Sequence, residues 1–194
     1  AVLARQAELL LTVLHEETYA QAEQLAEEAN LLYRELMQPA QEFETLATIV
    51  AARLQLSGSE EAIRTCREAM ADCSRDTGAR KSMVARIQLT MSSLYLGKEP
   101  ADLGRAAQLC TDAIASFKEF GDNRGVGEAH VQQMVIQRLA GDFSQALQTG
   151  ERAAALVQRS SDERLRARVM LEQAKIQFDR LLSEVETDTR KERE

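Results

Sequence analysis

Residues 141–153 read GDFSQALQTGERA, a glycine turn followed by the start of a helix in which two alanines lie seven residues apart. The same alanine pair recurs three more times in the 194-residue chain, at spacings of 40, 44 and 40 residues. The four pairs are Ala22 and Ala29, Ala62 and Ala69, Ala106 and Ala113, and Ala146 and Ala153. A period of this length is typical of repeat proteins in which each unit is a pair of helices.

Each alanine pair belongs to a longer stripe on one helix. The stripe positions lie 0, 4, 7 and 11 residues after the first alanine, which places them on one face of an α-helix. The first three positions carry small side chains, which allow a neighbouring helix to approach closely. Offset 4 holds Ala26, Cys66, Cys110 and Gly150, and offset 11 holds Tyr33, Cys73, Phe117 and Val157. We predict that these segments are the second helices of helical hairpins.

Glycine turns at 57–58, 97–100 and 141–142 precede three of these helices, and another segment of helical periodicity lies upstream of each turn. The fold is therefore predicted to be all-α, with about nine helices in one array over residues 1–182. The hairpins are predicted at about 1–37, 39–75, 79–119 and 123–159, with a capping helix at 162–182. Residues 183–194 (SEVETDTRKERE) are expected to form a helical extension or a frayed polar tail.

Composition limits the kinds of partner and compartment. A formal net charge of −7 argues against nucleic acid or an anionic membrane surface as a partner. No apolar run approaches the ~18 residues that a membrane-spanning helix needs, and three cysteines are too few for a disulfide-stapled secreted fold. We expect a cytoplasmic or otherwise intracellular protein. The chain begins inside a helical pattern without a methionine, so we expect a fragment of a larger protein.

The residues that could carry chemistry are better explained by packing. The three cysteines occupy stripe positions, and Cys66 and Cys73 lie about 10 Å apart along a helix, too far to share a zinc ion. His15 and His130 are interpreted as surface or helix-end residues. The glycines at 121, 125 and 127 are attributed to hairpin geometry. We expect no metal or cofactor site and no enzymatic activity. A group of basic side chains either meets an acidic partner or is simply solvated: Arg164, Arg166 and Arg168.

The segment Gly141–Leu147, with Ala153 following, resembles the turn and second helix of the tetratricopeptide repeat. Residues 120–143 resemble the variety of that repeat with a period of roughly 40 residues, found in spindle-orientation G-protein modulators, kinesin light chains and many bacterial regulators. The resemblance implies a right-handed α-solenoid that binds peptides or proteins, with the first helices of its hairpins lining a concave groove. The chain departs from the pattern by carrying Gln133-Met134 and Gln137 in a first helix.

The resemblance also implies which residues line the groove. In one hairpin they are Val84, Ile87, Met91, Leu94 and Tyr95, and in the next Val131, Val135, Arg138 and Leu139. Such an apolar groove suits an amphipathic helix or an extended peptide. The alternative is a shift of one or two residues in helix phase, which turns Val84, Ile87, Met91 and Leu94 into core. The glutamines at 133 and 137 suggest such a shift.

Two functions are consistent with these patterns. The first is a non-catalytic scaffold that binds a peptide, a helix or a neighbouring subunit of a larger complex through the groove. The second is a regulatory array of a signalling or transcription regulator, which senses a ligand or peptide.

Overall fold

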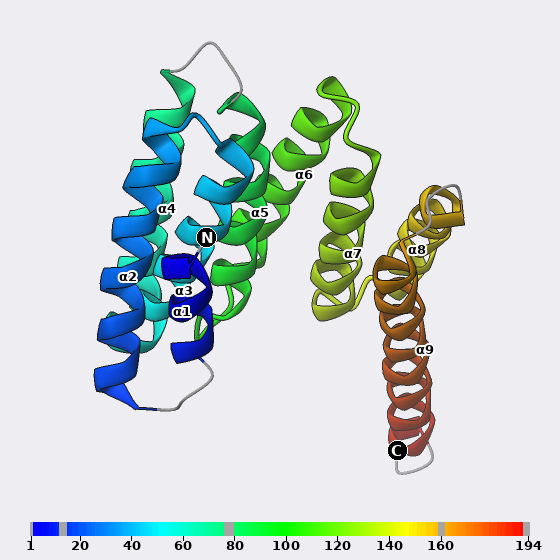
Figure 1. Cartoon of the computed structure of the whole chain (residues 1–194). Coiled ribbons are helices and arrows are strands. Elements are labelled where there is room, and N and C mark those ends of the chain that lie inside the picture. Colours follow the sequence, from blue (N-terminus) through cyan, green and yellow to red (C-terminus); the bar gives the residue numbers. More distant parts are fainter. Residues whose placement is uncertain (1, 12–14, 76–79, 159–161, 192–194) are drawn as a thin grey trace. The chain divides into compact units, whose positions relative to one another are not determined.

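The computed structural model describes residues 2–11, 15–75, 80–158 and 162–191, and within these ranges it contains nine α-helices and no strand (Figure 1). The helices are α1 (Val2–Leu10), α2 (Glu16–Glu35), α3 (Pro39–Ser57), α4 (Ser59–Ser74), α5 (Lys81–Leu96), α6 (Leu103–Glu119), α7 (Asn123–Leu139), α8 (Phe143–Gln158) and α9 (Glu163–Lys191). The all-α fold and the helix positions agree with the sequence prediction.

The chain forms two compact units, residues 1–101 and 102–194. The first contains α1–α5 and the second α6–α9. The boundary between them falls between the two helices of the hairpin predicted at 79–119, where the sequence analysis marked no domain break.

In the first unit, each helix packs on the next one along the chain, and α3 also contacts α1 and α5. The alanine stripe explains how the second helices pack so closely, because Ala22, Ala26 and Ala62 are fully buried. Gly58 both ends α3 and precedes α4, and its φ of +85° is one that residues with a side chain rarely adopt. Pro39 begins α3 at a position where its missing N–H costs no helical hydrogen bond.

In the second unit, α7 packs against α6, α8 and α9. Its core is made of buried side chains from α7, α8 and α9: Val131, Met134, Ala146, Ala153, Val157, Leu165, Val169 and Ile176. On α6, Ala106 and Ala113 are buried as the stripe predicts.

Two turns in the second unit have the same geometry. The Asp122 N–H donates to the Phe117 carbonyl oxygen at 2.9 Å, and the Asp142 N–H donates to that of Gln137 at 2.9 Å. In each turn the preceding glycine has positive φ, at +68° for Gly121 and +81° for the glycine at 141. This is the Schellman arrangement that ends helices. The Asp122 carboxylate also caps α7 by accepting a hydrogen bond from the N–H of Gly125 at 2.8 Å.

The last helix is longer than a capping helix over 162–182 would be. α9 continues to Lys191, so most of the predicted tail is a helical extension. Leu165, Val169 and Ile176 anchor one side of α9 in the core of the second unit.

Candidate functional site

The residues predicted to line the groove on α5 are mostly buried. Ile87 is 0% exposed, and Met91, Leu94 and Tyr95 are also buried, whereas Val84 is half-buried. Burial of this degree agrees with the alternative of a shifted helix phase, in which these side chains are core. The role of α5 in partner binding stays a prediction.

The predicted groove residues on α7 are more varied, and they belong to the other compact unit. Val131 is part of the core, Val135 is half-buried and Leu139 is 49% exposed. Arg138 donates a hydrogen bond to Asp179 on α9 at 2.6 Å, and its Nε lies 3.7 Å from Glu172. Arg138 therefore ties α9 to α7.

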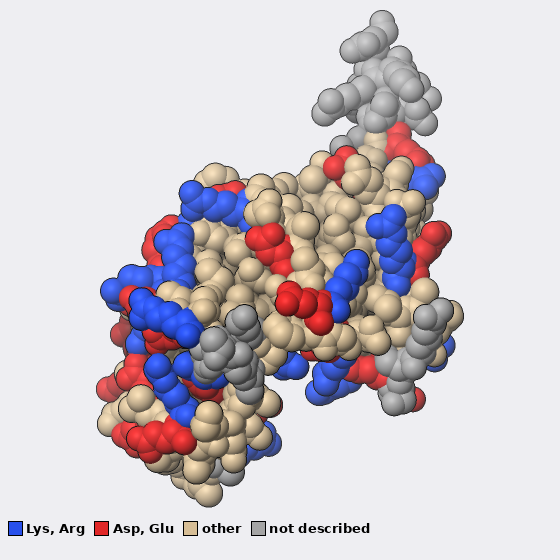
Figure 2. All heavy atoms as spheres, turned by 90° about the horizontal axis from the view of Figure 1, so that it is seen from above, with Lys and Arg blue, Asp and Glu red and all other residues tan. Residues whose placement is uncertain are grey.

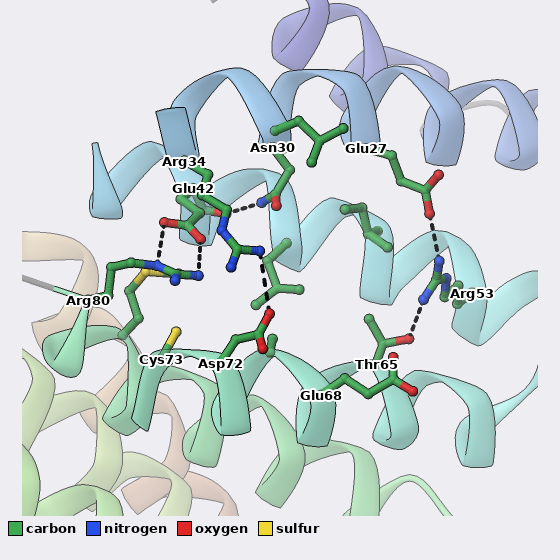
Figure 3. Close-up of a pocket in the computed structure, with 15 residues that line it drawn as sticks. Glu27, Asn30, Arg34, Glu42, Arg53, Thr65, Glu68, Asp72, Cys73 and Arg80 are labelled. Atoms are coloured by element: carbon green, nitrogen blue, oxygen red, sulfur yellow. Dashed lines mark hydrogen bonds and ion pairs between the residues drawn. The ribbon is translucent and has the colours of Figure 1, made fainter. Parts of the chain in front are cut away.

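A cleft that the sequence did not predict lies in the first unit, where side chains of α2, α3 and α4 line it (Figure 3). We call it the α2–α4 cleft. It has a volume of about 310 Å³. Leu46 and Ile49 of α3 and Met83 of α5 supply apolar lining, and Leu31 stands on the α2 side with 61% of its surface exposed. The stripe alanine of α4, Ala69, also lines the cleft and is only half-buried.

Arg53 joins three helices beside the cleft. Its guanidinium donates hydrogen bonds to Glu23 at 2.6 Å, to Glu27 at 2.6 Å and to the Thr65 hydroxyl at 2.7 Å. Burial alone would lower the pKa of Arg53, but the hydrogen bond that Arg53 donates to Glu23 and the charges of Glu23, Glu27 and Glu61 outweigh burial and raise this pKa. Arg53 therefore stays charged and holds α2, α3 and α4 together.

A second ion pair near the cleft is almost completely buried. Arg80 donates to both carboxylate oxygens of Glu42, and the two side chains are only 16% and 5% exposed. The Asn30 amide adds hydrogen bonds to the Glu42 carbonyl oxygen and to the Thr45 hydroxyl, both at 2.8 Å. These contacts fix α2 against α3 and link α3 to the residue that precedes α5.

The cleft is crossed by one weaker contact. Arg34 of α2 lies 3.4 Å from the Asp72 carboxylate of α4, and the two side chains are 48% and 40% exposed. An ion pair this exposed contributes at most about 1 kcal/mol, because water competes for both groups. Arg34 and Asp72 can therefore exchange partners with the charged groups of an incoming chain at little cost.

The ion pairs correspond to a sequence signal that helical periodicity does not show. Arg34–Asp72 and Glu42–Arg80 each join residues 38 positions apart, and so does Glu60 with Lys98. This separation is close to one repeat, so each pair connects a residue with one near the corresponding position of the next repeat. Opposite charges one repeat apart could have pointed to the α2–α4 cleft.

The cysteines are packing residues, as the sequence predicted. Cys66, Cys73 and Cys110 are buried and unbonded to one another. Burial raises the pKa of the Cys66 and Cys110 thiols to about 12. It also raises the pKa of the Cys73 thiol, against the opposing charge of Arg80. Within the described part of the chain, no three His, Cys, Asp or Glu side chains gather closely enough to hold a metal ion.

Two sequence interpretations are corrected. His15 is exposed just before α2, as expected, but His130 is a buried residue of α7, only 8% exposed, and not a surface or helix-end residue. Gly121 lies in a hairpin turn, but Gly125 and Gly127 lie inside α7 and are buried. His130, Gly125 and Gly127 are buried because neighbouring helices pack close to α7. Helical periodicity within one segment does not reveal how close a neighbouring helix lies.

Comparison with known proteins supports the fold. No family model matches the chain, and no curated protein matches its sequence. Among solved structures, a crystal structure of the apo form of RapI is similar, with a TM-score of 0.62 and 13% sequence identity. The similarity covers 85% of this chain, which spans only 60% of the RapI chain. This similarity shows the fold, which is of the helical-repeat class.

Two further observations concern the surface. Among the described residues, no helix is both long and apolar enough to cross a membrane. On the face that Figure 2 shows, acidic and basic side chains are interspersed among uncharged ones.

Proposed function

We propose that this chain is a non-catalytic protein-binding module, and that its α2–α4 cleft accepts side chains from a segment of another protein. The observation that carries the proposal is the cleft itself, whose lining combines apolar side chains with charged side chains of α2, α3 and α4. An apolar side chain of the partner would gain free energy by leaving water, at about 25 cal/mol for each Å² it buries. The charged groups around the cleft would orient the partner segment by pairing with its own charges.

The state of the three cleft arginines supports a binding role. Arg53 and Arg80 are held by carboxylates of the same unit, so this part of the cleft is preorganised. Arg34 and Asp72 are exposed and can turn towards a partner's charges. A rigid frame with one adaptable contact suits recognition, because little side-chain entropy is lost when a partner binds.

The second candidate is a regulatory module that senses a small ligand or peptide. The observation that favours it is the cleft volume of about 310 Å³, which lies near the lower end of the range for small-molecule sites, roughly 300–1,000 Å³. In that case the ligand would replace the Arg34–Asp72 contact and change the spacing of α2 and α4.

The test uses two leucines on one helix. Peptides selected from a displayed random library on the wild-type chain would be measured by calorimetry against Leu31→Glu and Leu32→Glu. Leu31 lines the cleft, whereas Leu32 is 51% exposed and does not. We expect Leu31→Glu to weaken binding at least ~10-fold, or about 1.4 kcal/mol, and Leu32→Glu to have little effect.

The outcomes separate the hypotheses. If Leu31→Glu and Leu32→Glu both bound the peptides as tightly as wild type, the cleft would not be the binding site. A loss with Leu139→Glu instead would favour the groove predicted on α7, since Leu139 is its most exposed member. Binding of small metabolites but not of peptides would favour the sensing module.

A further inference from the structure

Among the described residues of the second unit, the outer face of α9 is apolar and exposed. Leu165, Val169 and Ile176 turn towards the core, and the opposite face of α9 carries exposed apolar side chains. Its large members are 48–62% exposed: Met170, Leu171, Phe178, Leu181, Leu182 and Val185. Single exposed apolar residues are normal, but a continuous row along one helix marks an interaction surface.

The spacing of this row is that of a coiled coil. Its central positions alternate in steps of four and three residues: Ala167, Leu171, Ala174, Phe178, Leu181 and Val185. Such a repeat averages 3.5 residues and keeps one seam facing a second helix along its whole length. The seam runs over the 19 residues from Ala167 to Val185, which is about 27 Å of helix. We call these six residues the α9 seam.

The side-chain volumes of the α9 seam are complementary to those of a second, antiparallel copy. With the two-fold axis near residue 176, Ala174 lies opposite Phe178 of the second copy, and Ala167 lies opposite Val185 of that copy. The remaining layer pairs Leu171 with Leu181. A small residue thus faces a larger one in the Ala174–Phe178 and Ala167–Val185 layers, and two leucines of equal size face each other in the third, which allows close packing. A parallel pair would place Phe178 on Phe178 and Ala174 on Ala174, which crowds one layer and leaves a void in the next.

The distribution of charged side chains along α9 also favours the antiparallel orientation. Residues 163–175 carry four basic and two acidic side chains, whereas residues 176–189 carry four acidic and one basic. An antiparallel pair brings the basic half of each helix beside the acidic half of the other, and a parallel pair brings like charges together. Near the axis, Lys175 would approach its own copy, but Glu172 lies 2.6 Å from its ammonium group and offsets that charge.

We propose that a second copy of this chain docks on the α9 seam to form an antiparallel, two-fold symmetric dimer. The two-fold symmetry follows because the α9 seam is complementary to itself, so both copies use the same surface at the interface. The dimer gives the basic cluster of Arg164, Arg166 and Arg168 an acidic partner from the second copy. It is independent of the α2–α4 cleft, which lies in the other unit.

The first test is the mass in solution. Sedimentation over a dilution series should give a wild-type mass approaching twice the 21.6 kDa of one chain. Leu171→Glu and Phe178→Glu should each return it to a single chain, because a buried carboxylate would face apolar side chains. Leu32→Glu is the matched control, since Leu32 is 51% exposed and Leu171 is 54% exposed. Unchanged helicity by circular dichroism would show that the variants fold.

The second test fixes the direction of the pair. Leu171→Cys and Leu181→Cys would be prepared separately and mixed under mild oxidation. The antiparallel arrangement predicts a disulfide-linked dimer in the mixture and little in either variant alone, because residues 171 of the two copies would lie about 15 Å apart along the axis. The natural cysteines are buried, so wild type should give no background.

Three results would overturn the proposal. They are a wild-type chain that stays monomeric throughout the series, a dimer that survives both glutamate substitutions, and efficient linkage of Leu171→Cys with itself. The first would point to a different protein as the occupant of the α9 seam, and the last to a parallel pair.

Discussion

The ring of Phe117 on α6 lies directly against the backbone of Gly125 on α7. A Cβ at Gly125 would lie 2.3 Å from the ring's Cδ1 and 2.5 Å from its Cε1, closer than any real contact. Phe117 is only 2% exposed, so its ring is enclosed by the protein and cannot turn out into solvent. α6 and α7 can therefore approach this closely only because residue 125 has no side chain.

Gly125→Ala should accordingly destabilise the protein. The methyl group forces α6 and α7 apart, and overpacking of this kind costs about 1–3 kcal/mol. Urea unfolding followed by circular dichroism measures the loss. Gly104→Ala is the control, because its Cβ would meet nothing nearer than the Asp102 carboxylate at 3.7 Å, and alanine suits a helix better than glycine. Equal stability of Gly125→Ala and wild type would contradict the close packing.

Removing the buried arginine beside the cleft should be more damaging than removing an exposed one. Arg80→Ala leaves the Glu42 carboxylate buried without its partner, which typically costs about 3–5 kcal/mol. Arg64→Ala breaks the ion pair with Glu61. Because the Arg64 side chain is 62% exposed, this change should leave the free energy of unfolding almost unchanged. Chemical denaturation of both variants tests the difference. A similar small effect for both would show that Glu42 finds water in place of Arg80.

Acidification should weaken the second unit through His130. Burial is the main cause that lowers the pKa of His130 below its ordinary value of 6.5, and the charges of Lys118 and Arg152 act in the same direction, against the hydrogen bond with Gln133. The unfolded chain therefore binds a proton more readily than the folded one, and stability falls as pH drops below about 6.5.

The measurement is the free energy of unfolding between about pH 7.5 and 5.5, a range above the titration of ordinary carboxyl groups. His130→Gln removes the titrating group and should flatten the pH dependence while keeping a polar side chain near Gln133. If the variant and wild type showed the same slope, another group would have to account for it.

The thiols should be unreactive in the folded protein. Burial raises the pKa of Cys66 and Cys110 to about 12, so the reactive thiolate form is scarce at neutral pH, and the sulfur atoms are also covered. A thiol reagent such as Ellman's should label none of the three cysteines rapidly in buffer and all three in denaturant. Rapid labelling of one thiol in buffer would show that its helix opens locally.

The alanine stripe led to the right helices because helical periodicity is local in sequence. Every helix that it predicts is present, and seven of the eight alanines in the four pairs are buried. The exception, Ala69, lines the cleft. The face of α5 was harder to predict, since a shift of one residue turns a side chain by about 100°. Apolar side chains alone do not show whether that face binds a partner or a neighbouring helix.

The sequence by itself therefore determined that this chain is all-α with about nine helices, and that its cysteines are packing residues. Only the tertiary structure decided that Arg80 pairs with Glu42 across 38 residues, that His130 is buried and that Gly125 touches an aromatic ring. The physical reason is the sequence distance over which each kind of interaction acts. Helix formation depends on residues within a few turns, whereas burial and ion pairing depend on how far apart two helices lie and which faces they present.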